Sequence, residues 1–220
     1  MYMDKQLVIL FLSLFFVTNS FTQTDMKITE EAGGYLPAVE KYKSEIAINP
    51  AEYKLVYFLK DKINKEVVYI YRFEATGNPG DFNLHYTHIT IIVDSKKRLK
   101  GFSQITESMR GENNLGDSEC RQLALSFLKK YASDLKKTDF QWIDDQKISF
   151  LNTTSWKKES LNGKWVKFRD NETGYYLWVI LAPDGSIMEF DRDIFWSFFR
   201  GGRVNELWLR DDWFGKRISK

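Results

Sequence analysis

Hydrophobic and polar residues alternate along much of the chain after residue 50, with the two-residue period of β-strands. In the segment 53–60, every second residue from Tyr53 to Leu59 is aromatic or aliphatic, and the alternate positions include Lys54 and Lys60. Further strands are predicted at 67–73, 82–93, 99–105, 147–151, 164–169, 175–182 and 186–190. Turn signals separate them at 61–65, 77–80, 94–97, 162–163 and 183–185. The pattern therefore predicts antiparallel hairpins.

Two segments have the helical period instead. Residues 37–47 place Val39, Tyr42 and Ile46 on one face, and Pro37 suits the first helical position. The clearer helix is predicted at 117–135, where Asp117 or Ser118 can cap it. Its apolar stripe consists of Cys120, Ala124, Phe127, Leu128, Tyr131 and Leu135. We expect this stripe, and Phe127 in particular, to pack on the sheet of the second half.

The two halves of the chain resemble each other. The run 89–93, a turn, and then Leu99 and Phe102 matches 178–181, a turn, and then Ile187 and Phe190, at an offset of 88 residues. Each half has a helix followed by antiparallel strands. The sequence therefore predicts an α+β fold of two helix-on-antiparallel-sheet repeats, with units at 23–112 and 113–220. Whether they share one sheet or pack back to back stays open.

The second half resembles a PepSY-type module, a small exported unit with a helix packed on an antiparallel sheet. The residues that carry this resemblance are the helix DSECRQLALSFLKKYASDL (117–135) and the hairpin LWVILAPDGSIMEF (177–190), within 117–191. The first half shows it more faintly. The resemblance implies an extracytoplasmic binding or inhibitory role and gives no site residue.

The N-terminus has the order of a secretory signal peptide. Lys5 precedes an apolar run, 7–17, and small polar residues follow up to Thr22. The run is too short to span a bilayer as a helix. We expect residues 1–22 to be removed, a mature chain that begins near Phe21 or Gln23, a periplasmic or secreted location, and no stable membrane insertion after cleavage.

The composition indicates how the fold is stabilised and which partners it favours. Hydrophobic residues make up 43% of the chain, which is enough for a dense core. Cys120 is the only cysteine, so stability does not come from a disulfide. The formal net charge of +2 neither requires nor excludes a nucleic-acid partner and produces no large steering field. We expect no nucleic-acid partner.

Signals for catalysis and metal binding are weak. His85 and His88 are three residues apart on a predicted strand and point to opposite faces, so they do not form a joint zinc site. Cys120 lies on an apolar face, as an inert thiol does. The acid pairs Asp144/Asp145 and Asp191/Asp193 favour turns, caps or partners of Arg192 over acid–base work. We expect no catalytic residue, metal or cofactor.

The C-terminal segment 191–214 is too apolar for a free tail. All seven tryptophans lie in the second half of the chain, and this segment adds interleaved arginines and aspartates. Aromatic residues and arginine are enriched in interface cores. We expect part of the segment to pack on the sheet and part to bind a partner. The candidate binding residues are Trp196, Arg200, Arg203, Trp208, Arg210 and Trp213.

Two functions follow from these patterns. The favoured one is an exported, non-catalytic protein that binds or inhibits a protein or peptide partner. The alternative is a protein that binds or cleaves glycans in an aromatic-lined groove. A glycan groove needs coplanar exposed rings beside paired carboxylates, whereas a protein binder needs an exposed apolar patch. The exposure of the tryptophans distinguishes the two.

Overall fold

The fold is α+β, with two α-helices packed on one eight-stranded antiparallel sheet in the described part of the chain. The computed structural model describes residues 33–75, 87–112, 114–152, 157–197, 199, 201–210 and 213. The predicted signal peptide, the turn at 77–80 and His85 lie outside these residues. Among the described residues, no helix is both long and apolar enough to cross a membrane.

Each half contributes a helix and a four-stranded meander. The first half consists of α2 (Leu36–Ile46), a 3-10 turn (Pro50–Glu52), β1 (Tyr53–Ile63), β2 (Glu66–Ala75), β3 (His88–Asp94) and β4 (Leu99–Ile105). A second 3-10 turn (Glu107–Met109) leads to the second half. That half consists of α3 (Asp117–Tyr131), β5 (Thr138–Asn152), β6 (Lys157–Asp170), β7 (Tyr176–Leu181) and β8 (Ile187–Ile194), followed by the short strands β9 (Trp196–Ser197) and β10 (Gly202–Arg203).

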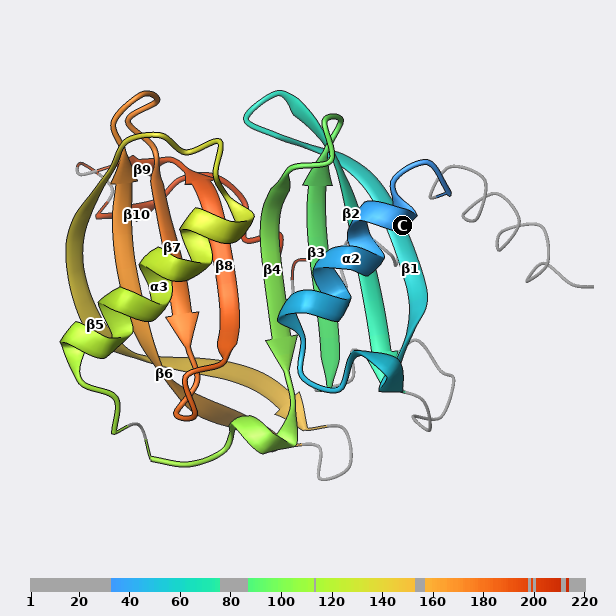
Figure 1. The fold of residues 1–220 in the computed structure, drawn as a ribbon, viewed down its shortest axis with the longest axis horizontal. Helices are drawn as coiled ribbons and strands as arrows, with labels where there is room; N and C mark the ends of the chain where they lie inside the picture. The colour runs from blue at the N-terminus through green and yellow to red at the C-terminus, as the bar shows by residue number, and fades with distance from the viewer. Residues whose placement is uncertain are drawn as a thin grey trace, which may run out of the picture.

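The two meanders join into a single sheet. The strand order is β1-β2-β3-β4-β8-β7-β6-β5, so the last strand of each half meets the other at the centre. This seam is short: Gly101, Phe102 and Ser103 of β4 pair with Asp191, Phe190 and Glu189 of β8. Both helices cover the same face of the sheet (Figure 1). The question of one sheet or two is thereby resolved in favour of a continuous sheet.

The strand registers repeat between the halves as predicted. Val93 pairs with Leu99 and Leu181 with Ile187, again 88 residues apart. Bulges recur as well, between Ile92 and Val93 in β3 and between Ile180 and Leu181 in β7. The turns match, because the Asp94 amide donates to the Arg98 carbonyl and the Ala182 amide to the Ser186 carbonyl. The correspondence of strands and turns is confirmed.

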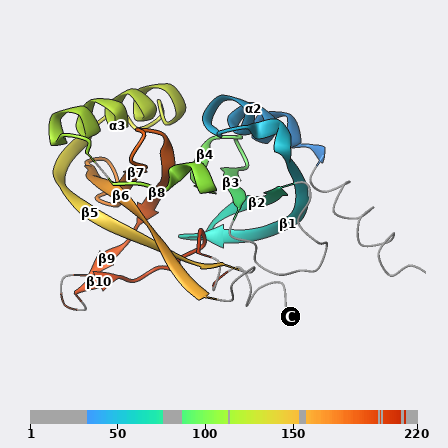
Figure 2. The same cartoon turned by 90° about the horizontal axis from the view of Figure 1, so that it is seen from below.

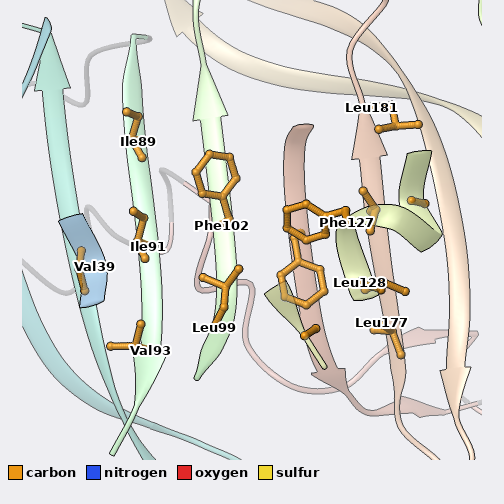
Figure 3. Close-up of a cluster of buried hydrophobic side chains, with 14 of the residues drawn as sticks. Val39, Ile89, Ile91, Val93, Leu99, Phe102, Phe127, Leu128, Leu177 and Leu181 are labelled. Carbon is orange, nitrogen blue, oxygen red and sulfur yellow. The ribbon is translucent and has the colours of Figure 1, made fainter. Parts of the chain in front are cut away.

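One hydrophobic core lies between the helices and the sheet and spans both halves (Figure 3). Val39 from α2 packs over the first half, and Phe127 and Leu128 from α3 pack over the second. Phe127 lies 5.2 Å from Phe190 between ring centroids, so the predicted stripe does face the sheet. Cys120 is fully buried in this core, and burial raises the pKa of its thiol. The predicted position of Cys120 on the apolar face of the helix is therefore confirmed.

Several predicted boundaries were wrong. The first turn is shorter than predicted, because β1 continues to Ile63 and only Asn64 and Lys65 turn, both with positive φ. Strands β5 and β6 are much longer than predicted. Helix α3 ends at Tyr131, and its N-cap is Gly116, with no side-chain cap from Asp117 or Ser118.

The predicted turn at Asn162-Gly163 was also wrong, since both residues pair with β5 inside a strand. A Cβ on Gly163 would lie 2.8 Å from the Ile180 side chain. Glycine at this position therefore permits close packing against β7, which a sequence pattern does not distinguish from a turn.

Candidate functional site

The face of the sheet opposite the helices, here called the back face, carries the end of the described chain (Figure 2). Strands β9 and β10 form a small hairpin there, and the described residues 204–210 and 213 follow it along the chain. Gly201 turns the hairpin with φ +62°, and the Val204 amide donates to the Phe195 carbonyl. We call the described residues of 195–213 the C-terminal strap.

Two buried carboxylates of β8 hold the strap. Asp191 accepts a hydrogen bond from Arg203 Nη1 at 2.5 Å and one from Trp208 Nε1 at 3.0 Å. The Arg203 guanidinium also lies over the Trp208 ring, 4.3 Å from its centroid. Because Asp191, Arg203 and Trp208 are nearly inaccessible to solvent, this contact is an internal anchor.

Glu189 forms the second anchor. Its carboxylate accepts a hydrogen bond from Trp178 Nε1 at 3.1 Å and pairs with Arg210 at 3.4 Å. Glu189 also lies close enough to Asp191 to oppose its ionisation. Burial, followed by this repulsion, outweighs Arg203 and raises the pKa of Asp191 to about 6. The Asp191 anchor is therefore sensitive to protonation.

The strap also connects the halves. Trp208 and Leu209 pack on the back face of the first half, against residues of β1, β2 and β3 that include Val68, Ile70 and Ile92. A Cβ on Gly101 would lie 3.3 Å from the Leu209 side chain. The strap thus begins under the second half, crosses the seam, and covers apolar side chains of the first half that would otherwise face water.

A lysine lies inside an aromatic cage beside the hairpin. The Lys167 ammonium is 3.9 Å from the ring centroid of Trp196 and 4.4 Å from that of Tyr176, and it also faces Trp142 and Trp165. Burial lowers its pKa. The cation–π contacts attach Trp196 to the sheet, so this predicted binding residue is half-buried by the protein itself.

Trp142, Trp165 and Trp178 form a row in which neighbouring rings are nearly perpendicular. Trp142 and Trp165 meet at an interplanar angle of 77°, and Trp165 and Trp178 at 85°. A sugar ring stacks on a flat exposed aromatic face, and none of the described tryptophans is exposed. Trp156 lies outside the described residues. The arrangement favours a core role for these rings over an aromatic glycan platform.

Most of the exposed side chains of the strap are apolar, although Glu206 is exposed as well. Six large hydrophobic side chains are exposed among the described residues, and four of them lie in the strap. Phe199 is fully exposed at the tip of the hairpin, and Phe195 is 50% exposed. The complete set in the strap is Phe195, Phe199, Val204 and Leu207. The strap therefore has an inner layer of anchors and an outer layer of apolar side chains.

The predicted binding residues are divided between these layers. Arg203 and Trp208 are internal anchors, Arg210 is a partly exposed anchor, and Trp196 is caged. Trp213 is half-buried and donates a hydrogen bond to the Glu206 carboxylate. Arg200 lies outside the described residues. A role in partner binding stays a prediction for all six. The exposed Phe195 and Phe199 were not among the predicted binding residues, although the same apolar run contains them.

The other chemical candidates separate in the structure. His88 is buried, with its ring 3.5 Å from the Ser103 hydroxyl. Asp144 and Asp145 are exposed, and Asp145 pairs with Lys164 at 2.8 Å. Asp191 and Asp193 bind different partners, so they do not form a carboxylate pair. No group of three potential metal ligands gathers anywhere in the described ranges.

Comparison with known proteins gives one match. A family model described as the YcdB, YcdC repeated domain matches residues 39–192, which is well over half of the chain. No curated protein and no solved structure matches the chain. The matched region covers both halves of the sheet and stops just before the strap. The chain belongs to the YcdB, YcdC repeated domain family.

Proposed function

We propose that this protein is an exported, non-catalytic binding or inhibitory protein that recognises a protein or peptide partner through the outer layer of its C-terminal strap. The observation that carries the proposal is the concentration of exposed apolar side chains at Phe195, Phe199, Val204 and Leu207. Exposed apolar groups of this kind mark interaction sites when they gather on one element. The PepSY resemblance of residues 117–191 implies the same class of role.

The anchoring of the strap supports the proposal. A binding surface costs less entropy on association when its backbone is already ordered. Here Arg203, Trp208 and Arg210 fix the strap to β8. The hairpin therefore presents Phe199 on a backbone that is already attached at its base.

A capture experiment tests the proposed partner. The wild-type chain, a Phe199→Ser/Leu207→Ser double variant and a Leu125→Ser control are used as bait in the envelope and secreted fractions of producing cells. Leu125 is a matched control because it is 42% exposed but lies on α3, away from the strap. The double variant should bind the partner at least about tenfold more weakly, as loss of a central apolar contact does.

Thermal melts of the three baits provide the second readout. All three should melt together, because exposed side chains contribute little to stability. If wild type, control and double variant retain the same proteins with equal affinity, the strap is not the binding surface.

Export has its own test. N-terminal sequencing of the envelope or secreted fraction should give a first residue near Phe21 or Gln23. A cytoplasmic pool that retains Met1 contradicts the proposed location.

A further inference from the structure

A pocket of about 300 Å³ lies at the seam between the two halves, and no residue of the strap is part of its lining. Its walls come from the turn after β1, from β4, from the residues after α3, from the β6–β7 turn and from the end of β8. A pocket of this volume is at the lower limit of sites that hold small ligands.

Six charged side chains that line the pocket form a closed ring of alternating sign, here called the charge ring. Three come from each half: Glu66, Arg98 and Lys100, and Asp134, Arg192 and Asp193. Successive N–O distances around the ring are 3.0 Å (Arg98–Glu66), 2.8 Å (Glu66–Lys100), 2.5 Å (Lys100–Asp193), 3.7 Å (Asp193–Arg192), 2.9 Å (Arg192–Asp134) and 3.5 Å (Asp134–Arg98). With three charges of each sign, the ring has no net charge.

The ring contains an unusual backbone conformation and an unused donor. Asp193 has φ +61°, a left-handed conformation that is unfavourable for a residue with a Cβ. The amides of Asn64 and Asn205 hold its carbonyl at 2.6 and 2.9 Å. The neighbouring Arg192 is buried, yet its Nε makes no hydrogen bond within the described residues. Strained residues and unsatisfied buried groups together are typical of binding sites.

We propose that the pocket binds an uncharged polyhydroxylated ligand, that is, a neutral sugar or the end of a neutral glycan. A hydroxyl group both donates and accepts, so one hydroxyl can donate to a carboxylate of the ring and accept from the adjacent cation. The unused Arg192 N–H beside the Asp193 carboxylate is such a donor–acceptor pair. Tyr175 adds an aromatic side chain to the pocket lining.

Charged ligands fit the ring less well. An anion would compete with Asp134 and Glu66 for the guanidinium groups that they already bind, and a cation would compete with Lys100 for Asp193. The ring itself is neutral. The pocket lining also includes Asp170, which accepts hydrogen bonds from the Glu172 amide and the Thr173 hydroxyl, and the exposed Glu172, so an anion would meet repulsion there. A cation would have to displace Lys100 from Asp193 and give up its own hydration. Burial alone would raise the pKa of Asp134, but Arg192 and Arg98 lower it below its usual value, so Asp134 keeps its charge near neutral pH.

Solution NMR of the full chain tests the proposal. Glucose, galactose and mannose serve as free-sugar probes and maltotriose as a probe of a glycan end, with glycine as a zwitterionic probe and inorganic phosphate as an anionic probe. At least one neutral probe should shift the backbone amides of Lys100, Thr173 and Asp193, which lie at the pocket, and leave those of the strap hairpin unchanged. A response to maltotriose alone identifies a glycan end as the ligand.

Two variants locate the binding. Asp193→Asn removes one ring charge but keeps a residue that tolerates the left-handed conformation. It should weaken sugar binding at least about tenfold, since hydrogen bonds to charged groups are the strong ones. Asp139→Asn, on an exposed position of β5, should bind like the wild type.

Three results overturn the proposal: no neutral probe shifts the pocket amides, glycine or phosphate shifts them instead, or Asp193→Asn binds sugar like the wild type. If Asp193→Asn does not fold, the map of shifted amides in the wild type still decides the question. The pocket lining contains neither Phe199 nor Leu207, the residues changed in the capture experiment, so a failure to bind sugar would leave the proposed protein partner untouched.

Discussion

Asp191 shows how one buried side chain connects distant parts of the chain. It lies on β8, yet its two hydrogen-bond donors, Arg203 and Trp208, come from the strap. Sequence reasoning identified Arg203 and Trp208 as interface residues because aromatic and arginine content favours interfaces. It could not identify the carboxylate that holds them inside, because that contact depends on the path of the strap across the sheet.

The raised pKa of Asp191 predicts a pH dependence of stability. Since its pKa is about 6 in the folded protein and about 4 in an unfolded chain, the folded state binds the proton more tightly. Stability contributed by this group is therefore present at low pH and is lost as the pH rises from about 4 to about 6. The loss amounts to roughly 3 kcal/mol.

Urea unfolding of the wild type and Asp191→Asn across this pH range measures the effect. The difference between their unfolding free energies should change by roughly 3 kcal/mol and then level off above about pH 7. Glu189, Arg203 and Arg210 face the same site and remain in both proteins, so their own contributions largely cancel. Parallel pH curves would mean that Asp191 does not titrate in this window.

At the scale of elements, the helices and most hairpins were predictable because their apolar period is regular. The β5–β6 hairpin was not. A bulge between Phe140 and Trp142 breaks the two-residue period of β5 near its start, and Gly163 resembles a turn residue in the middle of β6. The same kind of bulge lies between Leu55 and Tyr57 in β1. That strand was still predicted, because every second residue from Tyr53 to Leu59 is aromatic or aliphatic.

Helix α3 provides a matched pair of substitutions. Phe127 is buried against Phe190 and Tyr131, whereas Leu125, two residues earlier, is 42% exposed. Phe127→Ala should lower the free energy of unfolding by roughly 3–5 kcal/mol. Leu125→Ala should change it by no more than about 0.5 kcal/mol. Chemical denaturation of both variants checks the prediction, and equal losses would show that the stripe does not face the core.

For the whole molecule, the family match and the duplicated registers agree on a repeated unit. The sequence showed the duplication through the 88-residue offset but not how the halves join. That junction depends on Phe102 and Phe190 meeting across the seam, on the shared core and on the strap. All of these contacts join residues far apart in the sequence. Hydrophobic periodicity and turn motifs reflect only neighbouring residues, so they do not predict such contacts.

The shared core predicts that the halves unfold together. All seven tryptophans lie in the second half of the sequence, although Trp208 packs on the first half of the sheet. Their fluorescence therefore reports mainly the second half, whereas far-ultraviolet circular dichroism reports both. The two signals should follow the same denaturation curve, as a cooperative transition requires. A circular-dichroism transition that precedes or follows the fluorescence transition would show that the halves are independent units.

The exposed tip of the β9–β10 hairpin has a consequence for proteolysis. Phe199 is fully accessible there, and exposed loop tips are the preferred places for a protease to cut. A cut after Phe199 would divide the strap in two but leave Arg203, Trp208 and Leu209 of its C-terminal part in contact with the sheet. The protein would then behave as a non-covalent complex of two pieces. Its stability would depend on protein concentration, because a dissociated C-terminal peptide would have to rebind to the sheet.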